Sequence, residues 1–379
     1  MREKAMVSKK QIKNNANVGQ KRVFHEKLSP FLQQKFKSLL AEYGSLHENY
    51  LGILRQYKML PEENIQTPEI NRRHYDADIS ICETGGVRGV ERLYRRTVVI
   101  ELTMSCVAHC RYCLRQKYDL YTLTEQDIEM VARYCGSKQL KDEVNEVLIT
   151  GGDPFLVPKS LAYLVESLMQ YAPNIKIIRV ATRLPQQDPS RVSDAVLDVF
   201  RNKPGIRFEI ATQTNHAVEF FPEVRDCFSR IREVVPIIYS QNVLLKGVND
   251  NKESLLDLYE AMRSLGIQAH YLFHAVPMQG LRHFRTSVDK GLCLSRQITN
   301  CGVFSGRAKP MFALMTDIGK IILYEGAILK RDERARRILL HSGYKLEERM
   351  KWNPFWKMPD TAVVDNDGYL NVWYLDGKD

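Results

Sequence analysis

The chain has 379 residues, of which 26% are charged and 44% hydrophobic, and these proportions are ordinary for a globular protein. Part of the net charge of +10 lies in residues 1–22, which are polar, unpatterned and predict a disordered basic tail. No apolar run is long enough to cross a bilayer and no signal-peptide core opens the chain, so we expect a cytoplasmic protein with no membrane partner. No aromatic-and-basic pattern typical of RNA binding accompanies the charge, so nucleic acid is not an expected partner.

Residues 23–92 form a predicted helical region, because apolar residues recur there at three- and four-residue spacing from about 25 to 60. The glycines of ETGGVRG (83–89) then predict a loop. In residues 93–302, short β-branched runs alternate with helical segments. The predicted strands are 98–103, 146–150, 175–182, 207–214, 236–245 and 268–276, and the helices 124–135, 160–171, 193–202, 222–235 and 251–266.

Six strand–helix units predict parallel strands with right-handed crossovers. Six are too few for a complete eight-stranded barrel, so the expected fold class is α/β, a partial (β/α)6 TIM-like barrel. Residues 303–379 break the alternation and predict a β-rich cap. There, IGKIILYEG predicts a strand, and 361–376 predict a hairpin that turns at Asn366-Asp367-Gly368.

Three of the eight cysteines, Cys106, Cys110 and Cys113, fall in LTMSCVAHCRYCLRQ directly after the first barrel strand. Thiolates are the usual ligands of iron–sulfur clusters, and three of them leave one iron of a [4Fe–4S] cluster open to a substrate. The loop lies at the carboxyl end of the strand, where barrel enzymes keep their active sites. Two alternatives stay open: a zinc ion with His109 as fourth ligand, and a chance grouping of buried cysteines.

The C-x3-C-x2-C spacing, with Tyr112 before the last cysteine, resembles the defining motif of radical S-adenosylmethionine (SAM) enzymes. The segment EVLITGGDP resembles their second element, in which a glycine pair at the end of strand two meets the amino group of SAM. Gly151, Gly152 and Asp153 occupy that position. The resemblance implies a [4Fe–4S] cluster, bound SAM and a reductant of the flavodoxin or ferredoxin type.

From about Tyr94 to Lys309 the chain resembles the lysine 2,3-aminomutase family of radical SAM enzymes. The resemblance rests on CRYCLRQ, EVLITGGDP, VATRLPQQDPSRV, TNHAVEF, SQNVLLKGVND and QGLRHFRT, which occur in the family's order. It implies an isomerase that depends on pyridoxal phosphate (PLP) and acts on a small-molecule amino-acid substrate. In that chemistry a 5′-deoxyadenosyl radical takes a hydrogen atom, and nitrogen moves from C2 to C3.

The resemblance also implies roles for single residues. Arg115 matches the arginine that grips the substrate carboxylate, a task suited to a bidentate guanidinium. His216 and Gln241 match residues around the PLP ring, and Lys309 in SGRAKPMF matches the lysine that bonds covalently to PLP. At Lys309 the chain departs from the family, which places glycines where Arg307 and Ala308 stand.

Other departures bear on the ligands. The family's phosphate-binding arginine falls on Thr97 in an ungapped register, so Arg96 beside it is the expected phosphate ligand. Two aspartates that bind the distal ammonium of lysine are replaced by Val276 and Gly302. No cysteine follows Cys301, so the C-terminal zinc site of several family members is not expected.

The sequence therefore predicts an amino-acid 2,3-aminomutase whose substrate is not free lysine but has a neutral or acidic side chain. One alternative is a radical SAM enzyme on the same scaffold that acts on another amine or a protein-bound substrate, with or without PLP. A third hypothesis is a non-enzymatic iron–sulfur or nucleic-acid-binding protein. The sequence leaves a homo-oligomer open.

Overall fold

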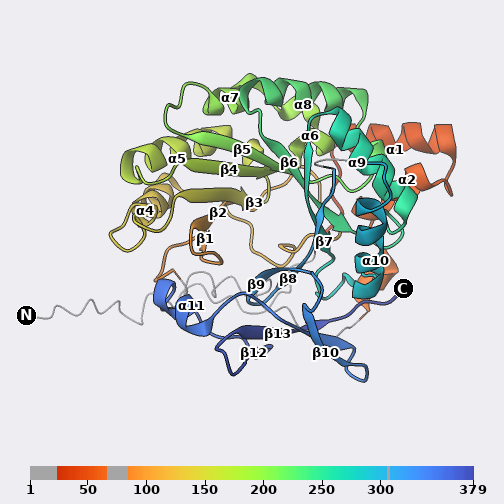
Figure 1. The fold of residues 1–379 in the computed structure, drawn as a ribbon. Helices are drawn as coiled ribbons and strands as arrows, with labels where there is room; N and C mark the ends of the chain where they lie inside the picture. Colours follow the sequence, from red (N-terminus) through yellow and green to blue (C-terminus); the bar gives the residue numbers. More distant parts are fainter. Residues whose placement is uncertain (1–23, 66–83, 305–307) are drawn as a thin grey trace, which may run out of the picture.

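The computed structural model describes residues 24–65, 84–304 and 308–379. The tail predicted for residues 1–22 and the first residue of the predicted loop 83–89 lie outside these ranges. Helices surround a curled sheet, and a second, smaller sheet lies beneath it (Figure 1). No helix in the described ranges is both long and apolar enough to cross a bilayer.

The large sheet has nine strands whose spatial order follows the chain. The central strands β2 to β8 run parallel, and one antiparallel strand flanks each edge. Six of the parallel strands coincide with the predicted β-branched runs, because such side chains fit a pleated, buried surface. The strands are β1 Val90–Glu91, β2 Thr97–Thr103, β3 Glu146–Gly151, β4 Ile177–Thr182, β5 Arg207–Thr212, β6 Ile238–Leu244, β7 Gln268–His274, β8 Met311–Thr316 and β9 Gly319–Ile322.

The helices that follow the strands cover the outer face of the curled sheet (Figure 1). Each long one has a single apolar face; α4 buries Ile128, Val131, Ala132 and Cys135, which recur at helical spacing. The predicted helix at 193–202 is shorter than expected and continues as a 3-10 turn. The helices are α4 Glu125–Cys135, α5 Pro158–Tyr171, α6 Leu184–Gln187, α7 Asp194–Leu197, α8 Pro222–Val234, α9 Lys252–Ser264 and α10 Val288–Thr299.

The partial barrel predicted from the sequence is confirmed, but it has a seventh parallel strand, β8, preceded by α10. The strand sequence MFALMT holds one β-branched residue, Thr316, so its composition did not mark it as a strand. Helix α10 contains Gly291, which weakens a helical pattern. A Cβ at Gly291 would lie 2.2 Å from the ring of Phe312, so glycine is what lets α10 pack against β8.

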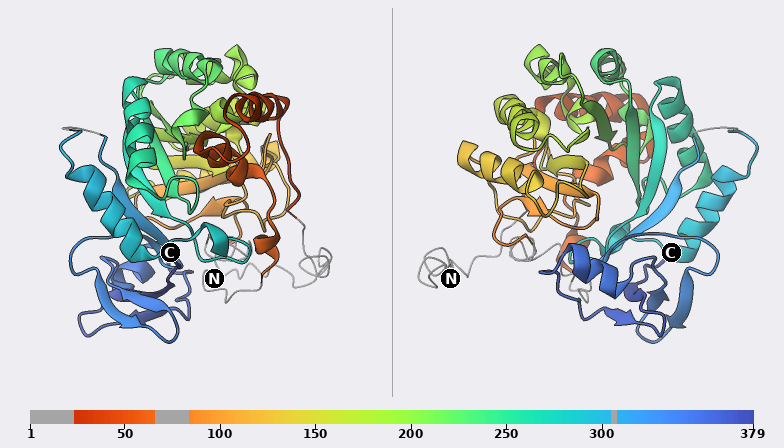
Figure 2. Two further views of the ribbon diagram at one scale, coloured as in Figure 1. Left: turned by 90° about the vertical axis from the view of Figure 1, so that its right-hand side faces the viewer. Right: turned by 60° about the vertical axis from the view of Figure 1, so that its left-hand side comes forward.

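The N-terminal region forms two helices, as predicted: α1 (Pro30–Tyr43) and α2 (Glu48–Tyr57). Helix α1 begins at Ser29, whose Oγ accepts the backbone N–H of Leu32 (3.0 Å). Figure 2 shows both helices packed beside the barrel. They extend the hydrophobic core, since Leu32 of α1 and Tyr57 of α2 are buried within it.

The C-terminal cap is a four-stranded antiparallel sheet in the order β10-β11-β13-β12, together with helix α11 (Leu346–Trp352). The predicted hairpin is confirmed, because β12 and β13 pair with Val364 opposite Leu370. The cap lies across the side on which the curled sheet is open (Figures 1 and 2). Its strands are β10 Ile328–Asp332, β11 Arg337–Leu340, β12 Ala362–Val364 and β13 Leu370–Leu375.

One buried residue of the cap, Arg349 of α11, joins the two edges of the barrel. Its guanidinium donates to the carbonyl oxygen of Leu93, before β2 (3.2 Å), and to that of Ile318, before β9 (2.6 Å). The side chain is 1% exposed, and the rings of Trp352 and Trp356 lie 4.8 and 5.1 Å from it. Arg349 therefore takes the place of the strand pairing that would close a full barrel.

Replacing Arg349 by Met should lower the free energy of unfolding by about 2–4 kcal/mol, because two buried carbonyl groups lose their donor. The measurement is urea denaturation of the cluster-free protein, followed by circular dichroism and by tryptophan fluorescence. Arg334→Met, at an exposed position of the same cap, is the matched control and should change stability by less than about 0.5 kcal/mol. Equal stability of the two variants would contradict a joining role for Arg349.

Candidate active site

A cavity of about 310 Å³ lies inside the curled sheet, which is within the usual size of small-molecule sites. Its wall includes all three cysteines of the predicted cluster loop. The other predicted site residues that line it are Gly151, Gly152, Asp153, Arg115 and Gln241. Three predicted site residues do not line it: Arg96, His216 and Lys309.

The cysteine loop follows β2, and its three thiols are half-buried. Burial raises the pKa of Cys106 well above its usual value, and the neighbouring Cys113 and Asp153 add to the effect. Thiolates held this close together require a positive charge between them, which bound iron would supply. The donor set therefore fits an iron–sulfur cluster.

The zinc alternative depends on His109, which the structure uses differently. Nδ1 of His109 donates to the carbonyl oxygen of His25 (2.8 Å), and its ring stacks on Phe24. Among the residues that the structure describes, no three Cys, His, Asp or Glu side chains are grouped to hold one metal ion. Ligands of a [4Fe–4S] cluster bind separate irons, so the cluster does not require the three thiols to converge on one point.

The N-terminal region holds the cysteine loop by its backbone. Lys27 donates from Nζ to the carbonyl oxygen of Cys106 (2.7 Å), and the N–H of His109 donates to Lys27 (2.9 Å). Farther along the loop, the N–H of Arg111 donates to the carbonyl oxygen of Gln56 in α2 (2.8 Å). The Arg111 guanidinium forms a buried ion pair with Glu63. The loop is thus fixed from outside the barrel.

Arg183, directly after β4, contacts the loop from inside the barrel. Its guanidinium donates to Sγ of Cys110 (2.9 Å), to the Tyr112 hydroxyl and to Gln56 (2.7 Å). It also forms a buried ion pair with Glu219. Sequence reasoning did not single Arg183 out, although a charged residue at the carboxyl end of a barrel strand was an available signal.

The glycine pair at the end of β3 allows two segments to touch. Gly151 has φ = +118°, and a Cβ at Gly152 would lie 2.3 Å from the carbonyl oxygen of Ser105. Asp153 accepts hydrogen bonds from the Thr182 hydroxyl and from the N–H of Arg183, each at 2.8 Å. Burial raises the pKa of Asp153 to about 6. Asp153 therefore fixes the residue that reaches Cys110.

Arg115 lines the cavity but already has two carboxylates. Its Nε donates to Glu101 (2.8 Å), and its terminal nitrogen donates to Glu91 (3.5 Å). Burial and the charge of Glu91 raise the pKa of Glu101 to about 8, and Arg115 opposes that shift. Glu91 and Glu101 therefore share the single guanidinium of Arg115. A substrate carboxylate at Arg115 would compete with Glu91.

The three predicted residues outside the cavity lie in different places. Arg96 is exposed and does not line the cavity, whereas the next residue, Thr97, does. His216 is buried against α2, where a Cβ at Gly52 would lie 2.6 Å from its ring, and its Nδ1 accepts the N–H of Val218 (3.3 Å). Lys309 is exposed, two residues before β8.

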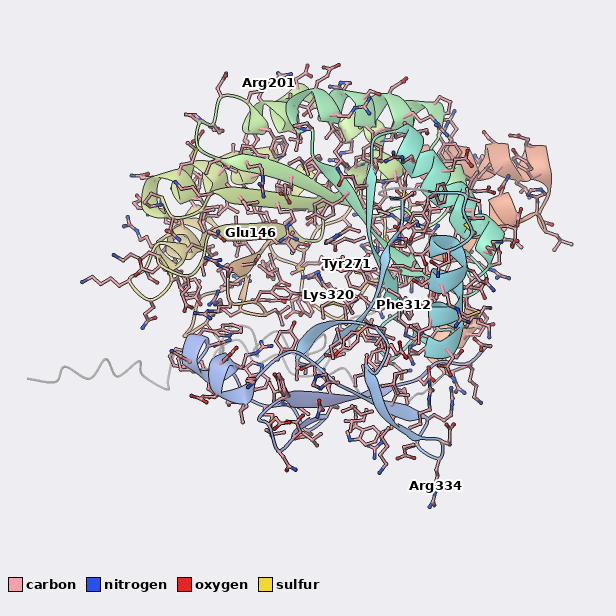
Figure 3. All side chains as sticks on the ribbon, viewed as in Figure 1. Glu146, Arg201, Tyr271, Phe312, Lys320 and Arg334 are labelled. Carbon is pink, nitrogen blue, oxygen red and sulfur yellow. The ribbon has the colours of Figure 1, made fainter. Side chains whose placement is uncertain are left out.

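Lys320 of β9 is a cavity residue that sequence reasoning missed, and it lies in the interior with Tyr271 and Glu146 (Figure 3). Desolvation lowers its pKa to about 7, and the positive charge of Arg179 adds to the effect. Its sequence, IGKIIL, gave no signal because the alternation of a strand does not tell which face meets a cavity.

The cations of the cavity wall differ in their partners. Each of its three arginines has a glutamate: Arg115 with Glu101, Arg179 with Glu146, and Arg183 with Glu219. Lys320 forms no ion pair with a carboxylate in the described ranges, and its ammonium group lies against aromatic rings. Among the described residues, the cavity thus carries one positive charge, that of Lys320, without a carboxylate counter-ion.

No family model matches the chain. A protein of Aquifex aeolicus named "Putative L-lysine 2,3-aminomutase" is 33% identical over 302 residues, which cover 78% of this chain and 74% of the relative. The glutamate 2,3-aminomutase of Clostridioides difficile is 24% identical over 223 residues, or 59% of this chain and 52% of that protein. A solved radical SAM methyltransferase from Sphaerobacter thermophilus gives a TM-score of 0.47 at 16% identity, covering 60% of this chain and 69% of that one.

The Aquifex relative decides the family, because its likeness extends over most of both chains. The matched length exceeds that of the predicted barrel, so it is not confined to the cysteine loop. The chain is an enzyme of the radical SAM type and belongs to the lysine 2,3-aminomutase family.

Proposed function

We propose that this protein is a radical SAM, PLP-dependent amino-acid 2,3-aminomutase whose substrate is not free lysine. One observation supports it above the others: a single cavity in a chain of this family joins the cysteine loop to a wall whose carboxylates are already engaged. Relatives named for lysine and for glutamate both match the chain, so family membership alone does not choose the substrate.

Cys106, Cys110 and Cys113 would hold the [4Fe–4S] cluster, and the backbone at Gly151 and Gly152 would meet SAM. When bound, cluster and SAM supply the radical, and PLP carries the migrating nitrogen. The protein would orient these groups, since Arg183 fixes the position of Cys110 and the side chains of the curled sheet line the cavity.

The wall of the cavity suits PLP, an aromatic ring that carries a phosphate. Phe273 and Tyr94 offer apolar faces, Gln241 offers an amide, and Lys320 offers a positive charge. These residues come from β6, β7, β9 and the segment before β2, so they surround the same space. Arg115 would hold the substrate carboxylate, in exchange for its longer contact with Glu91.

The expectation about the substrate depends on charge. A lysine substrate brings a second ammonium, and burying it without a counter-ion costs several kcal/mol. Val276 lines the cavity where lysine-acting relatives are expected to have an aspartate. Of the carboxylates in the wall, Glu91 contacts Arg115 and Asp153 accepts three hydrogen bonds.

A second candidate function is favoured by the exposed position of Lys309 outside the cavity. A radical SAM enzyme on this scaffold that acts on another amine or a protein-bound substrate would need no lysine bonded to PLP. The two functions differ in whether PLP can be fixed covalently to the protein, which is directly measurable.

The cluster is tested by replacing single cysteines with alanine. Cys106→Ala, Cys110→Ala and Cys113→Ala should each lose the cluster absorbance and the reductive cleavage of SAM, because an underligated cluster does not persist. Cys293→Ala, at a half-buried position on α10, is the control and should keep both. Iron and sulfide analysis after anaerobic reconstitution measures the result, and an active Cys110→Ala protein would contradict the assignment.

PLP binding is tested by borohydride reduction of the protein incubated with PLP, followed by peptide mapping. The expected label is on Lys309, which matches the family's PLP lysine in sequence although it lies outside the cavity lining, and reduction of the carbon–nitrogen double bond makes the attachment permanent. Lys309→Ala should lose the label and keep the cluster, whereas Lys330→Ala, at an exposed position of the cap, should keep both. Absence of any specific label would favour the second candidate function.

The substrate is tested by turnover of lysine against glutamate, glutamine and alanine under one anaerobic condition. Lysine should be the poorest of the panel for the wild-type protein. Val276→Asp should raise kcat/KM for lysine relative to alanine by about tenfold or more, since it supplies the missing counter-ion. Val276→Asn, of similar size without charge, should not. Lysine as the best wild-type substrate would contradict the proposal.

A further inference from the structure

Lys320 lines the same cavity as the cysteine loop, and the group that its positive charge would meet has not been specified above. It lies on β9, the antiparallel edge strand, opposite Met315 of β8. A lysine in a cavity wall without a carboxylate partner is rare, because an unpaired ammonium loses hydration and gains no ion pair in return. Such a residue calls for an explanation.

Aromatic side chains hold the ammonium in position. Nζ of Lys320 lies 3.8 Å from the centre of the Tyr271 ring and 5.6 Å from those of Tyr94 and Phe273. Cation–π contacts of this kind orient an ammonium without neutralising it. The charge of Lys320 is therefore positioned but not cancelled.

The charged groups around Lys320 leave the region positive. On β3 and β4, Glu146 and Arg179 form an ion pair with each other, so the nearest carboxylate is engaged. On β7, burial lowers the pKa of His270 to about 4, and Lys320 and Arg179 reinforce that shift, so His270 is neutral at pH 7. One net positive charge, that of protonated Lys320, remains.

Two charged neighbours of Lys320 lie away from the cysteine loop. Glu146 is the first residue of β3, and Arg179 lies in the first half of β4, so both are near the amino ends of their strands. Cys106 and Gly152 follow the carboxyl ends. The cavity lining includes the cysteine loop, Arg179 and Lys320, so a ligand that reacts near the cluster can extend its far end toward Lys320.

We propose that Lys320 is an anion-binding residue that pairs with the negative group at the far end of the bound ligand. Two groups of the proposed reaction have this chemistry: the side-chain carboxylate of an acidic amino-acid substrate, and the phosphate of PLP. The proposal rests on the proposed function and adds to it the residue that selects for negative charge.

The lowered pKa of Lys320 gives the pairing a pH dependence. Only the protonated amine attracts an anion, and in the free protein it is half-protonated near pH 7. Affinity for the anionic group should therefore be highest below pH 7 and fall by about tenfold for each pH unit above it, until the pKa of the complex is reached. No change in the charge of a neighbouring group should cancel this pH dependence. Arg179 and Glu146 form an ion pair with each other, and His270 stays neutral above pH 5.

The test uses two pairs of ligands that differ in the negative group: glutamate with glutamine, and PLP with pyridoxal. Dissociation constants are measured by calorimetry on the anaerobically reconstituted protein. Lys320→Met should reduce the preference for the anionic member of one pair by about 10- to 100-fold, the usual range for a charge-assisted hydrogen bond. Lys320→Arg should retain much of the preference for the anionic ligand. Lys330→Met, on the exposed surface of the cap, should retain all of that preference.

Loss of the glutamate preference would identify the substrate carboxylate as the partner, and loss of the PLP preference would identify the phosphate. Unchanged preferences in Lys320→Met, or a borohydride label on Lys320 itself, would overturn the proposal. In the wild-type protein, a preference for the anionic ligand that does not change between pH 6 and 9 would also overturn the proposal. Anion preference without rearrangement of any amino acid would instead contradict the proposed function and leave the anion site standing.

Discussion

The buried ion pair between Arg183 and Glu219 is the interaction on which the site depends. Its side chains are 8% and 3% exposed, so both charges must be satisfied by protein groups. Each bond that satisfies them fixes a different segment: Glu219 accepts the N–H of His216 (3.0 Å), and Arg183 reaches Gln56 of α2 and Cys110 of the cysteine loop. The barrel, the N-terminal helices and the cysteine loop are thereby held in one arrangement.

Features carried by neighbouring residues were predictable from the sequence. Each of these features is determined by residues that are close together in the sequence. Examples are the three cysteines within eight residues, the runs of β-branched residues and the turn of the β12–β13 hairpin. Arg183, Lys320 and the seventh strand were not predictable, because their roles arise from contacts between distant segments. His216 shows the same limit: its motif was recognised, but its ring packs against Gly52 of α2, which no local pattern could indicate.

The charges of the cavity show how a buried site can be both rigid and selective. Each arginine of the wall has a glutamate partner, and these pairs fix the wall at little net charge. Under the proposed anion site, discrimination by charge depends on Lys320, and desolvation of its surroundings strengthens its attraction for an anion. A site built from paired charges with a single exception needs few residues to distinguish one amino acid from another.

Arg349 has a consequence for the biosynthesis of the protein. The ribosome makes Arg349 after every strand of the barrel, so Leu93 and Ile318 stay unjoined while the strands pair in chain order. The cysteine loop is already complete at that stage, and the interior is still accessible from the side. Closure of the barrel edges is therefore a late step that waits for α11, and ligands of the interior can enter before it is complete.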